Sequence, residues 1–233
     1  PPPNFFFNLN TQSAILSGLV GSEMCIRDRG KRVDGRALDE SRELKIETNA
    51  IPKANGSARI YLGDTEVICG VKIQPDRPFP DTGDKGLFMC TAELLPLSHP
   101  TVETGPPQPP VIELARVTDR GIRESHMIDV SQLVIEKDKS VVGGFADNVV
   151  VDYDGNLFDA CSYAATAALL NSKTPTWEMV DEKPTLVEGE EKQLPINTIP
   201  VSVTMAKIGN YIVVDPNGDE WDVMDSRVTI TTD

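Results

Sequence analysis

The chain has 233 residues and a formal net charge of -14, with 39% hydrophobic and 25% charged residues. This length and composition suit one large α/β domain or two small ones, and they exclude disordered and fibrous classes. The negative charge excludes a protein that binds nucleic acid over its whole surface, because such affinity comes from basic side chains that neutralise phosphates.

Residues 1–29 differ in character from the rest of the chain. They include three consecutive prolines and three consecutive phenylalanines, and they follow neither the strand period nor the helix period. We expect a disordered or artefactual extension there, followed by a single domain over residues 30–233.

Three strands are predicted in the first half of this domain. Ser57–Leu62 and Glu66–Ile73 are rich in β-forming residues and flank a short glycine-containing turn, which indicates a hairpin. Leu87–Leu97 is the third strand. The preceding segment Arg36–Asn49 is polar and charged, and residues 105–110 (GPPQPP) are expected to form a stiff surface loop.

Helices alternate with strands in the second half. Helices are predicted at Val111–Ser125 and Leu157–Leu170. Pro184–Pro200 is expected to be a long connection, either irregular throughout or with a small hairpin in it. The predicted strands are Leu133–Ile135, Asn148–Tyr153, Val201–Lys207, Tyr211–Val214 and Arg227–Thr231. This order predicts an α+β fold, with a mixed sheet and helices packed on one face. The chain stops directly after a strand, so we expect a C-terminal helical part to be missing.

The first helix carries arginines on one face. Spacing of i, i+4 and i+7 places Arg116, Arg120 and Arg123 within about 60° of one another, opposite an arc of small and apolar residues. The planar donor fork of arginine suits phosphate oxygens, so this face could follow an RNA backbone without reading its sequence.

The same helix has a plainer interpretation. Its charges stand at the spacing of weak surface ion pairs, which the pattern alone favours over RNA contact. The pairs would be Glu113 with Arg116, Asp119 with Arg123, and Arg120 with Glu124.

Candidate catalytic and metal sites are weak. The turn at residues 154–156 precedes the second helix, but the first turn of that helix carries Asp159 and no basic residue, so capping is a better role for it than phosphate binding. Acidic residues at 215–225 suit a surface loop better than a magnesium site. The four cysteines form no CxxC pair and are expected to be buried free thiols. We expect no catalytic residue, metal or cofactor.

Several segments together resemble the non-catalytic RNase PH-like subunits of the archaeal exosome. They are KRVDGRAL at 31–38, ETNAIPKANGS at 47–57, FPDTGDKGLFMCTAELLPL at 79–97, ELARVTDRGIRE at 113–124, VDYDGNLFD at 151–159 and VVDPNGDEWDVMDSRVTITTD at 213–233. The resemblance runs from about Gly30 to Asp233, and residues 1–29 match nothing in the family.

The resemblance implies a ribosomal protein S5 domain 2-like fold. It also implies a hexameric ring in which this subunit alternates with a catalytic RNase PH-like partner, below RNA-binding cap subunits. Such rings degrade single-stranded RNA from its 3′ end with inorganic phosphate as the attacking group. The expected location is the cytoplasm, with no membrane contact.

Active members of this superfamily carry a Gly-Thr-Arg-Thr turn that binds the attacking phosphate. The matching positions here are Asn156, Leu157, Phe158 and Asp159. The general-acid aspartate is matched by Val213, and a second, metal-associated aspartate by Asp219. Since phenylalanine cannot bind phosphate electrostatically and valine cannot donate a proton, the resemblance implies a subunit without an active site.

The resemblance also implies that Arg116, Arg120 and Arg123 line the RNA path toward the active site of the partner. Two alternatives remain open at this point. A self-sufficient phosphorolytic exoribonuclease would need Asp219 to bind metal and a further basic residue to hold phosphate. A pure protein-interaction subunit would have its arginines covered by ion pairs or by a subunit interface.

Overall fold

The computed structural model describes residues 26, 30–181 and 183–233, and these form two compact units. The smaller unit holds the described residues up to Ser41 with Asp154–Asn156 and Thr204–Val228; the larger one holds Arg42–Tyr153, Leu157–Val203 and Thr229–Asp233. No helix in the described ranges combines the length and hydrophobicity needed to span a bilayer.

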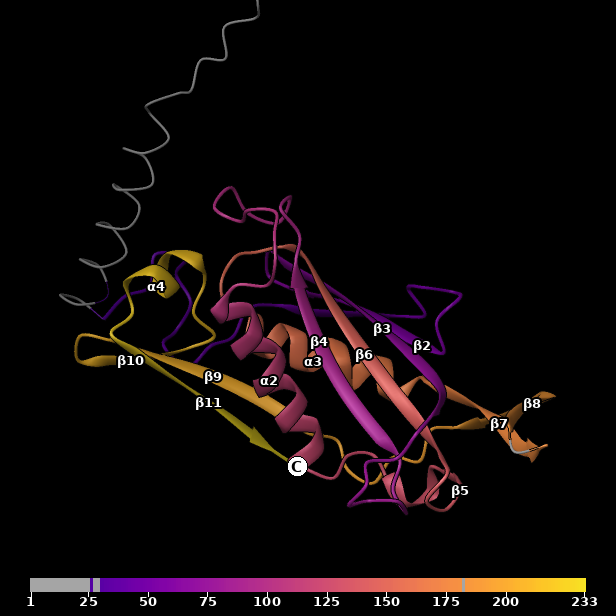
Figure 1. Cartoon of the computed structure of the whole chain (residues 1–233). Coiled ribbons are helices and arrows are strands. Elements are labelled where there is room, and N and C mark those ends of the chain that lie inside the picture. The colour runs from indigo at the N-terminus through magenta and orange to yellow at the C-terminus, as the bar shows by residue number, and fades with distance from the viewer. Residues whose placement is uncertain (1–25, 27–29, 182) are drawn as a thin grey trace, which may run out of the picture. The chain divides into compact units, whose positions relative to one another are not determined.

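The larger unit is built on a mixed six-stranded sheet (Figure 1). Its strands are β1 (Leu44–Thr48), β2 (Gly56–Leu62), β3 (Thr65–Asp76), β4 (Leu87–Leu94), β5 (Val134–Glu136) and β6 (Ser140–Asp152). The order is β1-β2-β3-β6-β4, with β5 on β6; only the β4–β6 pair is parallel. The predicted hairpin is confirmed, because Leu62 pairs with Thr65 and Gly63 turns with φ +58.

Two helices cover one face of this sheet (Figure 1). α3 (Leu157–Leu170) packs on β2, β3 and β6, and α2 (Pro109–Glu124) packs on β4 and on α3. Alanines let α3 approach closely: a side chain at Gly56 in β2 would place its Cβ 2.5 Å from the Ala168 carbonyl oxygen. The predicted α+β class, with a mixed sheet and helices on one face, is confirmed.

The remaining strands form two smaller sheets. β9 (Val201–Ile208), β10 (Tyr211–Val214) and β11 (Ser226–Thr232) pair in the order β10-β9-β11. β7 (Lys173–Val180) and β8 (Lys183–Gln193) form an antiparallel hairpin. A short helix, α4 (Gly218–Val223), follows β10, and a 3-10 helix lies at Val130–Gln132.

Several predicted boundaries were wrong. β1 lies in a segment expected to be only polar, and the predicted connection over Pro184–Pro200 is largely one arm of the β7–β8 hairpin. β6 begins eight residues before the predicted Asn148, and β4 ends at Leu94. α2 begins at Pro109, because proline in the first turn of a helix gives up no hydrogen bond.

Of the predicted extension over residues 1–29, only Ile26 falls within the described residues. Its side chain is fully buried and belongs to an apolar cluster of the smaller unit with Ala206, Ile208 and Val213. Its carbonyl oxygen accepts a 2.9 Å hydrogen bond from the Gly30 N–H. Ile26 is therefore part of the folded structure.

Candidate nucleic-acid interface

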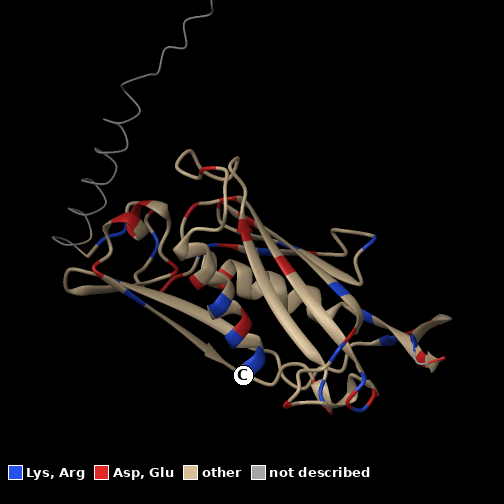
Figure 2. Ribbon diagram, in the orientation of Figure 1, with Lys and Arg blue, Asp and Glu red and all other residues tan. Residues whose placement is uncertain are grey.

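The two faces of α2 differ in burial as the helical period predicts. Leu114, Thr118 and Ile122 are buried against the rest of the larger unit. The buried Thr118 hydroxyl donates to the Leu114 carbonyl oxygen one turn back, at 2.9 Å, so it needs no outside partner. The arginines lie on the other side, where Figure 2 shows basic and acidic bands alternating along α2.

Arg123 is held in place by a tie between α2 and β4. Its Nη2 atom lies 2.8 Å from Asp119 Oδ2 and donates to the Phe88 carbonyl oxygen at 3.1 Å. Asp119 Oδ1 accepts the Cys90 backbone N–H at 3.1 Å. The Arg123 side chain is still 55% exposed, so its other donors remain available to a ligand.

Arg116 and Arg120 are exposed and differ from Arg123 in their pairing. Within residues 30–181 and 183–233, neither takes part in a salt bridge. Of the ion pairs predicted for this helix, the one between Asp119 and Arg123 is therefore confirmed, whereas the two that involve Arg116 and Arg120 do not form.

All three arginines line one groove of about 560 Å³ between α2 and β4. The β4 side is formed by Met89, Cys90, Thr91 and Ala92. Arg116, Arg120 and Arg123 lie along the α2 side, with Asp119 among them. This α2–β4 groove combines exposed guanidinium groups with one that is held in position, as expected of a surface that follows a phosphate backbone.

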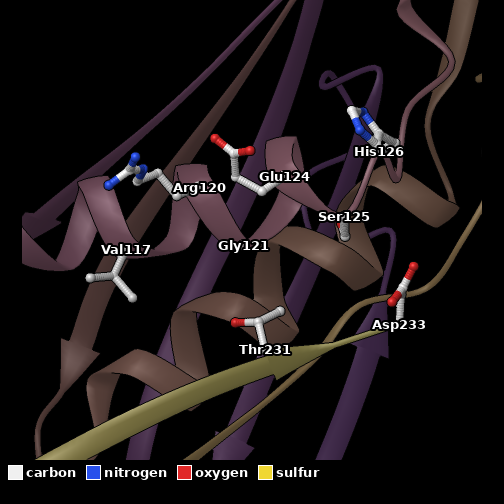
Figure 3. A pocket seen from close by; sticks show the side chains of 8 residues that line it. All are labelled: Val117, Arg120, Gly121, Glu124, Ser125, His126, Thr231 and Asp233. Atoms are coloured by element: carbon white, nitrogen blue, oxygen red, sulfur yellow. The ribbon is translucent and has the colours of Figure 1, made fainter.

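A second hollow, of about 450 Å³, lies at the C-terminal end of α2 (Figure 3). Val117 points from α2 toward β11, the strand that carries Thr231, whereas Arg120 and Glu124 point away from that strand. Gly121 allows the close approach, because a Cβ there would lie 3.3 Å from the Thr231 hydroxyl oxygen.

The positions matched to the phosphate-binding turn are closed to a ligand. Phe158 and Asp159 stand in the first turn of α3 and are buried, and the Asn156 before them is fully buried with φ +40. The Asn156 side-chain amide donates a 2.7 Å hydrogen bond to Asp215 Oδ1. An apolar ring therefore occupies the position that the resemblance matches to a phosphate-binding arginine.

The position matched to the general acid is equally apolar. Val213 in β10 has no exposed surface and packs with Ala206 and Ile208. Asp219, the second matched position, lies exposed in the first turn of α4. No group of three or more His, Cys, Asp or Glu side chains in the described part of the chain has the arrangement of a metal site.

The acidic segment at 215–225 is held by two arginines that the sequence reasoning did not single out. Arg32 is buried and donates to both carboxylate oxygens of the buried Glu220, at 2.8 and 2.6 Å. Arg36 Nη1 lies 3.3 Å from Asp215 Oδ2. The KRVDGRAL motif supplies both arginines, so its chemistry here is structural. The sequence held one signal for this contact, namely a basic motif at 31–38 and a segment of opposite charge at 215–225.

Cys69, Cys90 and Cys161 are buried free thiols, as predicted, and Cys25 lies outside the described residues. Burial, followed by the charge of Asp119, raises the pKa of the Cys90 thiol from 9.0 to about 12. Burial also raises the pKa of Cys69 and Cys161. Thiols that stay protonated are poor nucleophiles, so none of these cysteines suits catalysis.

Comparison with protein families gives two adjacent matches. Residues 40–175 match domain 1 of the 3′ exoribonuclease family, and residues 198–233 match domain 2 of the same family.

Individual relatives agree. The chain is 48% identical over 221 residues to the exosome complex component Rrp42 of Thermococcus gammatolerans, covering 94% of this chain and 81% of that protein. It is 50% identical over 208 residues to Rrp42 of Archaeoglobus fulgidus, covering 89% and 77%.

Solved structures are similar over the same length. A chain of the Archaeoglobus fulgidus exosome with RNA bound to the active site superposes with a TM-score of 0.86 at 47% identity, covering 94% of this chain and 84% of that one. A chain of an archaeal exosome core superposes with a TM-score of 0.82 at 43% identity, covering 96% of this chain and 83% of that one. Rice Rrp46 shares the fold, with a TM-score of 0.65 at 19% identity.

Proposed function

The chain belongs to the 3′ exoribonuclease (RNase PH) family, and we propose that it is a non-catalytic, RNA-binding subunit of an archaeal-type exosome. In this role it forms a ring with a catalytic RNase PH-like partner, beneath RNA-binding cap subunits, in the cytoplasm. The similarity to exosome components named Rrp42 and to exosome core structures supports the assembly.

The observation that carries the non-catalytic part of the proposal is the apolar burial of the matched catalytic positions. Phosphorolysis needs a cationic cradle for phosphate and a proton donor for the leaving oxygen. Phe158 and Val213 can supply neither, and both are buried. The phosphorolytic chemistry then belongs to the partner.

The α2–β4 groove supports the RNA-binding part. Arg116 and Arg120 are exposed cations without a salt-bridge partner in the described ranges, and Arg123 is fixed by Asp119 and β4. With a net charge of -14 over the chain, these grouped arginines stand out as a local cationic surface. Their role is to guide the RNA backbone to the active site of the partner.

The self-sufficient enzyme is the weaker candidate. Asp219 is exposed in α4, but the nearby carboxylates of Asp215 and Glu220 are neutralised by Arg36 and Arg32. A divalent cation would have to compete with these arginines for its ligands. A pure protein-interaction subunit would require the arginine face to be covered by the partner.

The decisive experiment measures phosphate-dependent release of nucleoside diphosphates from a single-stranded RNA. The purified chain alone is expected to release none, and the complex with the catalytic partner is expected to release them. Release by the chain alone, lost in Asp219→Asn, would establish the self-sufficient enzyme instead.

The arginines are tested by the salt dependence of RNA affinity in the assembled complex. Arg116→Gln, Arg120→Gln and Arg123→Gln are each expected to lower the slope of log K against log salt by about 0.7, the value for one phosphate contact on a single strand. Lys53→Gln removes an exposed charge between β1 and β2 and serves as the matched control. Unchanged slopes in all three arginine variants would favour the protein-interaction subunit.

A further inference from the structure

A hollow of about 550 Å³ lies between the loop that joins β3 to β4 and the C-terminal end of α2, entirely within the larger unit. Its floor is apolar: Leu87, Phe88, Ile122 and Ile128 line it and are all buried. Phe79 on the loop also lines it, with 56% of its surface exposed. This Phe79 hollow has the volume of a typical small-molecule site, ~300–1,000 Å³, and an aromatic ring at its edge.

Two cations lie at the rim of the Phe79 hollow. Lys85 is exposed and makes no salt bridge with any residue in the described ranges. Arg123 lines both this hollow and the α2–β4 groove. The hollow therefore shares Arg123 with the α2–β4 groove and lies beside the arginine surface.

The rim also carries two carboxylates, Asp81 and Glu124. Both are exposed, and neither forms a salt bridge within the part of the chain that the structure describes. They disfavour a phosphate inside the hollow. They are suitable acceptors for the exocyclic amino group of adenine, cytosine or guanine, which uracil lacks.

We propose that the Phe79 hollow is a nucleobase subsite for single-stranded RNA. Phe79 stacks on one base, Asp81 and Glu124 accept from its exocyclic amino group, and Lys85 and Arg123 contact the adjoining phosphates. An aromatic platform beside cations is the usual recognition surface for single strands. The subsite rests on the proposed function, because it requires a complex that binds single-stranded RNA.

The test uses the complex reconstituted with a catalytically inactive partner, in phosphate-free buffer. Fluorescence anisotropy of labelled oligo(A) and oligo(U) is measured over a range of potassium chloride concentrations. Phe79→Ala is expected to weaken oligo(A) binding fivefold or more, as expected from loss of a stacking aromatic, without changing the salt slope. Phe79→Tyr, which keeps the ring, is expected to restore the affinity.

Two further comparisons sharpen the result. Leu97→Ala removes a comparably exposed apolar side chain away from the hollow and is expected to leave both affinities unchanged. Asp81→Asn and Glu124→Gln are expected to narrow the preference for oligo(A) over oligo(U). An equal effect of Leu97→Ala and Phe79→Ala would overturn the subsite.

The outcomes separate the subsite from the proposed function. If Phe79→Ala changes nothing while the arginine replacements lower the salt slope, the subsite is wrong and the proposed function stands. If the arginine replacements change nothing while Phe79→Ala weakens oligo(A) binding, the arginine path is wrong and the subsite stands. If Phe79→Ala instead abolishes assembly in light scattering, the hollow is a subunit contact and the subsite is overturned.

Discussion

Asp119 and Arg123 form an i, i+4 ion pair on α2, with Asp119 Oδ2 2.8 Å from Arg123 Nη2, and both side chains also bond to the backbone of β4. The pair thus joins a helix to a strand, which an ordinary surface pair on a helix does not do. The Asp119 side chain is only 17% exposed, so the hydrogen bond that it accepts from the Cys90 N–H is shielded from water.

Asp119→Ala is therefore expected to lower the free energy of unfolding by about 1–2 kcal/mol, because it leaves the Cys90 N–H without its partner. Urea unfolding followed by circular dichroism measures the change. Arg123→Gln leaves that bond intact and should cost less than about 1 kcal/mol. Equal losses in the two variants would contradict the assigned role of Asp119.

The buried pair of Arg32 and Glu220 is expected to be essential for the smaller unit. Arg32 also donates to the Val214 and Asp215 carbonyl oxygens, so either partner left alone is a buried charge without compensation. Arg32→Met or Glu220→Gln should cost about 3–5 kcal/mol.

The matched control for this pair is Lys139→Gln, which breaks the exposed pair with Glu136. It should cost less than about 1 kcal/mol in the same urea titration. A loss in Arg32→Met no larger than that of the control would show that the buried pair adds little.

Gly155 is expected to tolerate no side chain. It has φ +75, and a Cβ there would lie 2.4 Å from the Asn217 carbonyl carbon. Gly155→Ala should destabilise the chain by about 1–3 kcal/mol or more, since strain and a backbone clash add. Gly35→Ala is the control, with φ +82 and open space around its Cβ. Both variants place alanine at a positive φ, so the difference between their melting temperatures measures the effect of the clash at Gly155. Similar melting temperatures would argue against the clash.

Val213→Asp places a carboxylate at the position that the resemblance matches to the general acid, and we expect this variant to yield no phosphorolysis. The carboxylate would enter the apolar cluster with Ala206 and Ile208, at a cost of several kcal/mol. Val228→Asp on the half-exposed surface of β11 should cost far less. Phosphate-dependent nucleoside diphosphate release by a stable Val213→Asp chain would show that the position of Phe158 does not prevent phosphate binding.

The buried thiols predict a loss of stability at alkaline pH. The pKa of Cys90 is about 12 in the folded chain against 9.0 for a free thiol, so above pH 9 the unfolded chain releases a proton that the folded chain keeps. The stabilising contribution is complete below pH 9 and is lost as the pH rises toward 12. The free energy of unfolding of Cys90→Ser should decline less between pH 8 and pH 10 than that of the parent chain. Parallel declines would exclude this linkage.

Local patterns in the sequence were enough to predict much of the fold. α3 begins and ends at the predicted Leu157 and Leu170, and β10 coincides with the predicted Tyr211–Val214. The face of Arg116, Arg120 and Arg123 follows from helix geometry alone. Each of these features depends on residues close together in the chain, where the helix or strand period is visible directly.

The other features of the fold and of the candidate site were decided by the tertiary structure, because they depend on contacts between segments that are distant in the chain. β1 is an edge strand with mostly exposed residues, so its pairing with β2 left no alternation of burial to read. Arg32 and Glu220 stand 188 positions apart, and only the fold turns both charges inward. The tie from Asp119 to β4 and the hollow beneath Phe79 likewise exist only once β4 lies beside α2. A one-dimensional period specifies which side of an element is apolar, but not which other segment will cover it.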